Sequence, residues 1–243
     1  MSTLRIDGRM YNQNRPLQIT NHYLMHPAGS VLIEMGNTKV ICTATVEHGT
    51  ARHLKGTGQG WITAEYGMLP ASTGKRKIRG SSKGKLDGRS MEIQRLIGRS
   101  LRSAVDMQAL GENTIWIDCD VIQADGGTRT ASITGAFIAM VEAMKYMKEN
   151  DMIDFIPVKN FVSAISVGLV NNQILLDLCY LEDSSASVDM NVVMTDAGEY
   201  IEIQGTGEES PFSQEALTDL LSIAKEGCLD LIAAQKELLG NLE

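Results

Sequence analysis

A strand-like run and a helix-like run meet at two consecutive glycines, and this junction limits the possible folds more than any other feature of the sequence. From residue 114 to 124, apolar residues alternate with polar ones, which is the period of a half-buried strand. From residue 133 to 147, apolar residues recur at steps of three and four, as on a helix that packs against a core. The sequence therefore predicts a strand, a tight turn and a helix in direct succession.

The turn itself, residues 125–132, has the composition of an anion-binding site. Gly126 and Gly127 let the backbone approach a ligand closely, and the free N–H groups of a first helical turn favour negative charge. Thr128 and Arg129 add a hydroxyl donor and a guanidinium suited to phosphate oxygens. A glycine pair can equally mark a plain turn before a capped helix, but an arginine in the first turn is unfavourable unless an anion lies beside it. The segment matches neither the GxGxxG nor the GK[ST] nucleotide-loop pattern.

Charge is unevenly distributed along the chain, although the net charge of −8 by itself argues against a nucleic-acid partner. Between Lys75 and Arg102 there are ten basic residues and two acidic ones. From Glu182 onward the balance reverses, with 14 acidic residues and only two lysines. Such asymmetry predicts a basic surface for a polyanion on an otherwise acidic protein.

The basic segment divides into a loop and a helix. Glycines and serines interrupt residues 75–88, which predicts an exposed, flexible loop, whereas residues 90–105 carry apolar side chains at helical spacing. Arg89 lies at the junction, where it could meet an anion held by the turn at Gly127. The candidate polyanion-binding residues are Lys75, Arg76, Lys77, Arg79, Arg95 and Arg99. For the helical arginines, which form one stripe with Arg102, a solvated face is the alternative.

Acidic residues gather at the end of a further predicted strand, residues 173–181. Glu182 and Asp183 follow it, and Asp189 begins the next predicted strand after a short connection rich in serine. If the two strands are neighbours, Asp183 and Asp189 lie close together at one sheet edge, and such hard oxygen ligands suit Mg²⁺. Simple turn chemistry is the alternative. Asp177 is a competing ligand candidate, but its position within the strand favours a structural role.

Strands and helices recur in two weakly similar halves. Residues 29–46 and 162–180 each have the pattern of strand, turn and strand. Amphipathic helices are predicted later in each half, over residues 90–105 and 213–239, with Ser213 as the N-cap of the second. This order predicts mixed sheets covered by helices, an α+β fold.

The chain length of 243 residues suits one large domain made of these two halves. We place the halves at about 1–145 and 160–243, with a connector near 146–159 that includes Pro157. The first ten residues carry charges rather than an apolar export core, and no apolar run reaches the roughly 18 residues of a membrane span. We therefore expect a cytoplasmic protein without membrane contact. The four cysteines have no metal or redox spacing, so they are predicted to be buried, reduced thiols.

Ordered motifs along most of the chain resemble the ribonuclease PH family of phosphate-dependent 3′ exoribonucleases. The resemblance extends from about Asp7 to the C-terminal helix and is specific, because many blocks occur in the same order. The matching blocks are DGR (7–9), GSVL (29–32), KGTGQGW (55–61), TAEYGMLP (63–70), GRSMEIQRLIGR (88–99), DCDVIQADGGTRT (118–130) and DMNVVMT (189–195).

The resemblance implies a fold, an assembly and a reaction. The fold is a pair of βαβα halves of the ribosomal-protein-S5-like type, and the assembly is a homohexameric ring built as a trimer of dimers. Polynucleotide phosphorylase and exosome core subunits are relatives. The reaction is removal of nucleotides from the 3′ ends of tRNA precursors and other structured RNA by inorganic phosphate, which releases nucleoside diphosphates and can run in reverse. Processing of rRNA is a further duty that this resemblance suggests.

The same resemblance implies roles for particular residues. Arg89 together with Gly127, Thr128 and Arg129 would hold the attacking phosphate, and Asp183 with Asp189 would hold the metal. The chain departs from the family pattern after Leu69-Pro70, where Ala71 replaces an arginine, and again where Gly80-Ser81-Ser82 replaces a more charged stretch. The basic residues of the loop could compensate for these departures by contacting RNA or a neighbouring subunit; they are Lys75, Arg76, Lys77 and Arg79.

Two other functional classes are compatible with parts of the sequence. A non-catalytic RNA-binding ring subunit of the exosome type is one, but it would not require the arginines, the Gly-Gly turn and both aspartates together. A small-molecule phosphotransferase on a related fold is the other, with ATP held at the glycine-rich turn. The absence of nucleotide-loop spacing and the long basic loop disfavour that second class.

Overall fold

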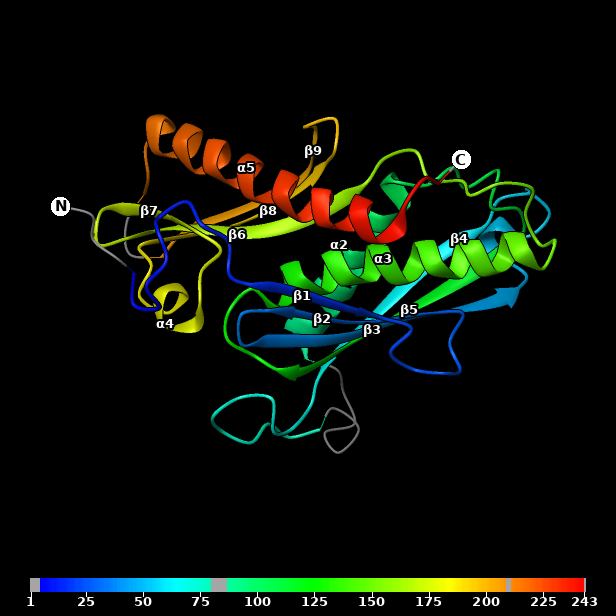
Figure 1. The fold of residues 1–243 in the computed structure, drawn as a ribbon, viewed down its shortest axis with the longest axis horizontal. Helices are drawn as coiled ribbons and strands as arrows, with labels where there is room; N and C mark the ends of the chain where they lie inside the picture. The colour runs from blue at the N-terminus through cyan, green and yellow to red at the C-terminus, as the bar shows by residue number, and fades with distance from the viewer. Residues whose placement is uncertain (1–4, 80–86, 209–210, 243) are drawn as a thin grey trace.

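Two β-sheets and the helices that pack on them form the computed structural model, which describes residues 5–79, 87–208 and 211–242 (Figure 1). The five-stranded sheet has the order β1-β2-β3-β5-β4, and the four-stranded sheet has the order β7-β6-β8-β9. The strands of the first sheet are β1 Leu17–Asn21, β2 Gly29–Met35, β3 Thr38–His48, β4 Trp61–Met68 and β5 Asn113–Gln123. The strands of the second are β6 Val162–Val170, β7 Gln173–Leu176, β8 Val188–Thr195 and β9 Tyr200–Gly207.

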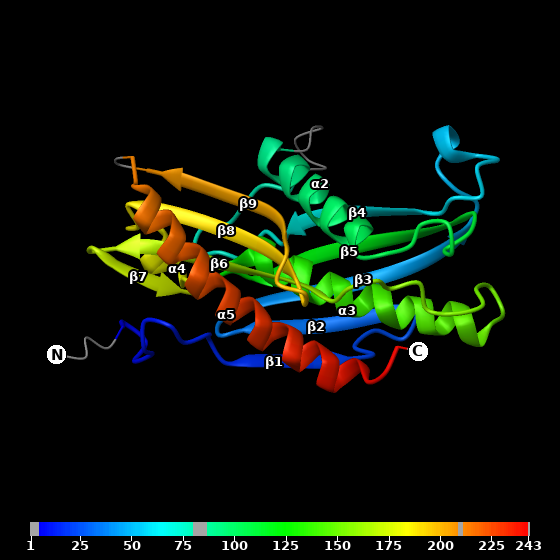
Figure 2. The same ribbon diagram turned by 90° about the horizontal axis from the view of Figure 1, so that it is seen from above.

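Three long helices and two short ones complete the described structure. The long helices are α2 Gly88–Ser103, α3 Thr128–Glu149 and α5 Gln214–Leu239; the short ones are η1 Arg52–Leu54 and α4 Tyr180–Asp183. Figure 2 shows the two sheets side by side, with α5 running across the second. The prediction of an α+β fold is confirmed. The first sheet is mixed, because β4 runs parallel to β5, whereas all strand pairs of the second sheet are antiparallel.

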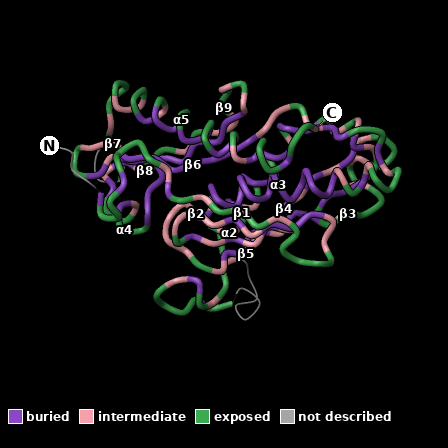
Figure 3. The backbone as a smooth tube through the Cα atoms, viewed as in Figure 1, coloured by how far each residue is buried: buried purple, intermediate pink, exposed green. Residues whose placement is uncertain are grey.

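The central helix α3 is buried on nearly all sides (Figure 3). It packs against β2 and β3 of the first sheet and also against β6 of the second. One apolar stripe was predicted for this helix, and that prediction was too narrow, since small residues such as Thr134 and Gly135 are buried as well. A Cβ at Gly135 would lie 2.7 Å from Cγ2 of Ile33, so close packing on the first sheet requires glycine there. A helix in contact with two sheets cannot show a single buried face.

The predicted strand over residues 173–181 is wrong in its second part. Strand β7 ends at Leu176, and the residues after Cys179 form the helical turn α4. Asp177 has a φ of 53°, in the left-handed region, and its carboxylate binds Arg15, which breaks the strand. Strands β7 and β8 are not neighbours either, because both pair with β6. Asp183 is therefore presented by a helical turn rather than by a sheet edge.

Helix boundaries agree with the predicted capping residues where a cap was predicted. Ser213 is the N-cap of α5, and its side chain accepts a hydrogen bond from the N–H of Ala216 at 3.2 Å. At the start of α2, the Asp87 carboxylate accepts from the N–H of Ser90 at 2.6 Å. Helix α3 continues to Glu149, so the first residues of the predicted connector are helical.

Two further predictions concern the cysteines and the membrane. All four cysteines are buried and free, as predicted. Within residues 5–79, 87–208 and 211–242, no helix combines the length and the apolar character that a membrane crossing needs.

Candidate functional site

A cleft of about 1480 Å³ lies where the start of α2, the start of α3, the turn α4 and strands β8 and β9 come together. The three groups of residues singled out in the sequence all reach this cleft, although the chain separates them widely. Its lining includes the predicted site residues Arg89, Gly127, Thr128, Arg129, Asp183 and Asp189. Both halves of the chain thus contribute to one concave, polar site.

The Gly-Gly turn at the start of α3 adopts a conformation that requires glycine. Gly126 and Gly127 have φ values of 76° and 61°, both in the left-handed region. A Cβ on Gly126 would lie 2.5 Å from the carbonyl oxygen of Leu178. Gly127 is the N-cap of α3 and makes no side-chain cap, so the first N–H groups of the helix remain available to an anion. The Thr128 hydroxyl is held 2.9 Å from the Tyr66 hydroxyl beneath the turn.

A methyl group at Gly126 should damage this turn. We expect Gly126→Ala to cost about 1–3 kcal/mol of unfolding free energy, because the left-handed φ and the clash with a backbone carbonyl both act against it. Phosphate affinity should fall with it. The matched control is Gly198→Ala, which has a similar φ of 79° but would meet only the Lys225 side chain, at 3.3 Å. Chemical denaturation and phosphate titration of both variants test this; equal phosphate affinity in the two would contradict it.

One end of the Arg129 guanidinium is already engaged. Its Nη1 donates to Oε1 of Gln204 at 2.7 Å and to Oε1 of Glu92 at 3.3 Å. Gln204 itself donates to Glu92 and to Glu202, both at 3.1 Å. These contacts hold a mostly buried guanidinium in one orientation at the cleft. Arg89, on the first turn of α2, is exposed.

Both aspartates have raised pKa values, and burial is the largest cause for each. Burial raises the pKa of Asp189 to about 6, and the charge of Asp183 contributes to the rise, while Arg129 and Arg89 act in the opposite direction. Burial also raises the pKa of Asp183, against the lowering effect of Arg89 and Arg129. The Oδ1 atom of Asp189 is buried without a hydrogen-bond partner. An unsatisfied carboxylate oxygen beside a second carboxylate is a fit for a divalent cation.

A cation held here would depend on few protein ligands. The described ranges contain no group of three or more His, Cys, Asp or Glu residues placed to bind a metal. Two carboxylates are nevertheless the donor set typical of Mg²⁺, which keeps several waters and shares its shell with substrate phosphates.

The basic residues are distributed unequally around the cleft. Lys75 and Lys77 line it, whereas Arg76, Arg79 and Arg95 are exposed outside its lining. Arg99 pairs with Glu202, with N–O distances of 2.8 and 2.6 Å. Lys83 and Lys85, counted in the basic segment, and Gly80-Ser81-Ser82 lie outside the described residues.

The helical stripe of arginines is not one free basic face. The guanidinium of Arg102 lies 4.4 Å from the ring centre of Trp61 and donates to the carbonyl of Ile62 at 2.8 Å. With Arg99 bound to Glu202, only Arg95 of the three is exposed without such a contact among the hydrogen bonds and ion pairs of the described residues.

Several residues of the cleft were not found from the sequence. Gln204 and Glu92 contact Arg129, and Tyr180, Ser184, Ser185 and Glu208 also line the cleft. None of them was assigned a chemical role from the sequence, although Glu92 lies in the block GRSMEIQRLIGR. For Glu92 alone a signal existed, because it lies one helical turn after Arg89 and so shares its face of α2.

Comparison with known proteins finds one family that matches both halves of the chain. Residues 13–145 match domain 1 of the 3′ exoribonuclease family, and residues 160–227 match domain 2. Ribonuclease PH from Bacillus cereus strains AH187 and AH820 is 57% identical to the chain over 240 residues, covering 98% of this chain and 98% of each relative.

Solved structures share the fold at lower sequence identity. Rice (Oryza sativa) Rrp46 has a TM-score of 0.80 at 20% identity, covering 98% of this chain and 100% of that one. The Archaeoglobus fulgidus exosome with RNA bound to the active site has a TM-score of 0.82 at 20% identity, covering 96% and 92%. At this identity the likeness establishes the fold alone.

Proposed function

The chain belongs to the ribonuclease PH family of 3′ exoribonucleases, and on that premise we propose that its cleft carries out phosphorolysis of RNA 3′ ends. In this reaction inorganic phosphate attacks the last 3′–5′ phosphodiester, releases a nucleoside diphosphate and leaves the RNA one nucleotide shorter. The reverse reaction adds nucleotides. The observation that carries the assignment of the site is the meeting of two arginines, an uncapped helix start and a pair of aspartates in one cleft.

Binding of the attacking phosphate is proposed for the turn and the two arginines. The first N–H groups of α3, the Thr128 hydroxyl and the guanidinium groups of Arg129 and Arg89 supply donors and positive charge from two directions. Phosphate is largely a dianion near neutral pH, so no side chain has to remove a proton from it. The site's task is to hold two mutually repelling anions in line for attack.

Asp183 and Asp189 are the proposed ligands of Mg²⁺. When bound, Mg²⁺ would offset the negative charge of the RNA 3′-terminal phosphate and of the leaving oxygen. The orphaned Oδ1 of Asp189 and the raised pKa values of both carboxylates support this assignment. Asp177 is not a ligand in this proposal, because its carboxylate is fully buried against Arg15.

A single assay tests the proposed function. A tRNA with extra 3′ nucleotides is incubated with the protein and Mg²⁺, with and without inorganic phosphate, and the products are separated. Phosphate-dependent release of nucleoside diphosphates is the expected result. Release of monophosphates without phosphate would refute phosphorolysis. RNA binding without any product would instead favour the non-catalytic ring subunit.

The basic loop is proposed to guide RNA toward the cleft. We expect Lys75→Ala and Lys77→Ala each to weaken RNA binding and to reduce the slope of log affinity against log salt by about 0.7 to 1. The control is Lys225→Ala, since Lys225 is an exposed lysine on α5 outside the cleft lining. Filter binding between about 50 and 200 mM salt gives the slopes. If both loop variants keep the wild-type slope of log affinity against log salt, these lysines do not contact RNA.

The assembly, the domain plan and the location are parts of the same proposal. We propose one domain of two halves, at about 1–145 and 160–243, because a single hydrophobic core cluster contains residues of both sheets and of α3 and α5.

Family membership supports a homohexamer, which sedimentation analysis would test. The proposed substrates, precursors of tRNA and rRNA together with phosphate, are cytoplasmic, and so is the proposed place of action.

A further inference from the structure

Three arginines near the N-terminus are buried against the second half of the chain. Arg5, Arg9 and Arg15 are 7%, 6% and 4% exposed. Arg5 donates to Glu182 at 2.8 and 2.5 Å, and Arg9 donates to Asp7 at 2.7 Å. Buried charges are costly unless they are paired, and each of these arginines forms an ion pair with a carboxylate.

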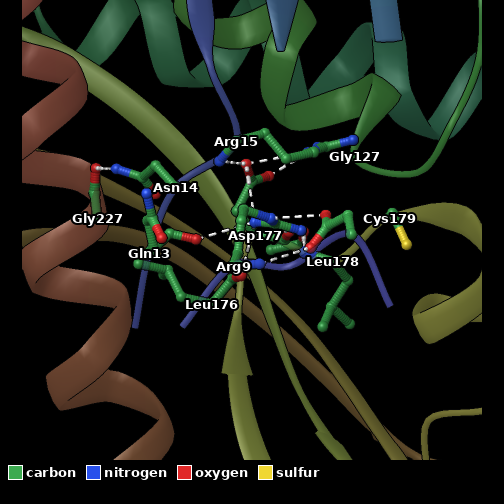
Figure 4. Close-up of polar contacts among 12 residues, drawn as sticks. Arg9, Gln13, Asn14, Arg15, Gly127, Leu176, Asp177, Leu178, Cys179 and Gly227 are labelled. Carbon is green, nitrogen blue, oxygen red and sulfur yellow. Dashed lines mark hydrogen bonds and ion pairs between the residues drawn. The ribbon is translucent and has the colours of Figure 1, made fainter. Parts of the chain in front are cut away.

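Arg15 is anchored to Asp177 by three hydrogen bonds. Its backbone N–H donates to Oδ2 of Asp177 at 2.8 Å, its Nε donates to the same oxygen at 3.0 Å, and its Nη2 donates to Oδ1 at 2.6 Å. This is the bidentate fork that only a guanidinium provides. Figure 4 shows Arg15 placed between Asp177 and Gly127.

The other end of the same guanidinium supports the Gly-Gly turn. Nη1 of Arg15 donates to the carbonyl oxygen of Asp125 at 2.6 Å. Nη2 lies so close to the turn that a Cβ on Gly127 would be 2.7 Å from it. Thr38 braces the same turn, because its hydroxyl donates to the carbonyl of Gly126 at 2.6 Å and accepts from the N–H of Asp125 at 2.9 Å. Arg15 is not part of the cleft lining.

The segment that follows Asp177 leads directly to Asp183. Asp177 is held in the left-handed region, and its N–H donates to the carbonyl of Ser166 at 2.7 Å. Three residues later α4 begins, with the Tyr180 N–H donating to the Asp125 carboxylate at 3.2 Å. Arg15 therefore touches the start of the segment that carries one aspartate of the site and also the turn of the opposite half.

We propose that Arg15 is a positioning residue, whose guanidinium fixes the turn at Gly126-Gly127 relative to the segment that bears Asp183. The inference rests on the proposed binding of phosphate at that turn. A lysine at this position would keep the charge but could not donate to both Asp177 oxygens and to the Asp125 carbonyl together. The turn would then lose support from beneath, although no residue that lines the cleft has been replaced.

A matched pair of variants, Arg15→Lys and Arg9→Lys, separates positioning from stability. Arg9 is equally buried and donates to the carbonyls of Gln13 and Asp177, at 2.9 and 3.0 Å. It also lies 3.9 Å from a carboxylate oxygen of Asp177 and 3.6 Å from one of Glu182, so it shares the acidic segment with Arg15. Among the hydrogen bonds and ion pairs of the described residues, none joins Arg9 to the turn at Gly126-Gly127. Both variants should lower the melting temperature. Only Arg15→Lys should raise the KM for phosphate, by about tenfold, with the KM for RNA unchanged.

The positioning role of Arg15 and the proposed phosphorolysis fail on different results. Equal phosphate KM values in wild type and Arg15→Lys, or equal increases in both variants, would overturn the positioning role. Wild-type protein whose activity does not depend on phosphate would instead refute the proposed function. If Arg15→Lys does not fold, Thr38→Val removes the neighbouring brace without leaving a buried charge unpaired. It should raise the phosphate KM by about threefold, and an unchanged value would count against the brace.

Discussion

Replacing Asp189 with asparagine is expected to abolish phosphorolysis and, in the absence of metal, to make the protein more stable. The loss of activity should exceed about 100-fold, because a metal ion that neutralises phosphate charge is worth several kcal/mol in the transition state. The gain in stability has a separate cause. Asparagine has nearly the same shape as aspartate but never places a charge beside Asp183 in this partly buried position.

The stability difference should depend on pH in a defined direction. In the folded protein the pKa of Asp189 is raised from 3.8 to about 6, first by burial and then by Asp183. Such a carboxyl stabilises the fold fully below about pH 4, and that stabilisation is lost as the pH rises through about 6. A difference of about two pKa units corresponds to about 3 kcal/mol at most. Asp189→Asn should therefore exceed wild type by about 1–3 kcal/mol at pH 8 and by nothing near pH 4.

Urea unfolding in EDTA at several pH values measures this difference. Asp219→Asn is the control, because Asp219 is exposed on α5 and does not line the cleft. Addition of Mg²⁺ should stabilise wild type more than Asp189→Asn. A variant that degrades RNA normally, or one that is less stable than wild type at pH 8 without metal, would argue against Asp189 as a strained metal ligand.

The parts of the fold that depend on local periodicity could be predicted from the sequence. The strand expected over residues 114–124 is β5, and Ser213 caps α5 as its position next to an amphipathic run suggested. The Gly-Gly turn could be located for the same reason, because the change from a period of two to a period near 3.6 marks it. The excess burial of α3 could not be predicted, since it results from a second sheet contributed by later residues.

The local structure around the aspartates could not be predicted because its cause is distant in the chain. Arg15 lies 162 residues before Asp177, and their contact ends β7 and allows α4 to form. The residues next to Asp177 in the sequence do not indicate that it pairs with Arg15. The proximity of Asp183 and Asp189 was thus expected through an incorrect pairing of strands, even though both line the cleft.

Gln204 illustrates the same limit within the site. It lies on β9, and nothing in its surrounding sequence distinguishes it from other polar residues of that strand. Its importance arises from a hydrogen bond to Arg129, 75 residues earlier, and from the shared contact with Glu92. Charged and glycine-rich motifs identify which residues face an anion, whereas the neutral residues that orient them are recognised only in three dimensions.

The second large effect is expected for Arg129→Ala, which should raise the phosphate KM by about 100-fold, compared with about tenfold for Arg89→Ala. A guanidinium that is held in place loses little entropy when it binds an anion, and Arg129 is held by Gln204 and Glu92 whereas Arg89 is exposed. Removal of Arg129 also leaves the Glu92 carboxylate beside the cleft without this cation, which adds repulsion toward phosphate.

The pH profile provides an independent readout of Arg129→Ala. The Arg129 charge lowers the pKa of Asp189, so its loss should raise that pKa further above about 6 and shift the acid limb of activity to higher pH. Arg89 lowers the pKa of Asp189 less than Arg129 does, so Arg89→Ala should shift the part of the limb that reports Asp189 less. Arg52→Ala is the control, because this exposed arginine of η1 does not line the cleft. An unchanged phosphate KM in both cleft variants would exclude the two arginines from phosphate binding. If Arg129→Ala raises the KM for phosphate but leaves the acid limb unchanged, Arg129 binds phosphate but its charge does not affect the pKa values of the two aspartates.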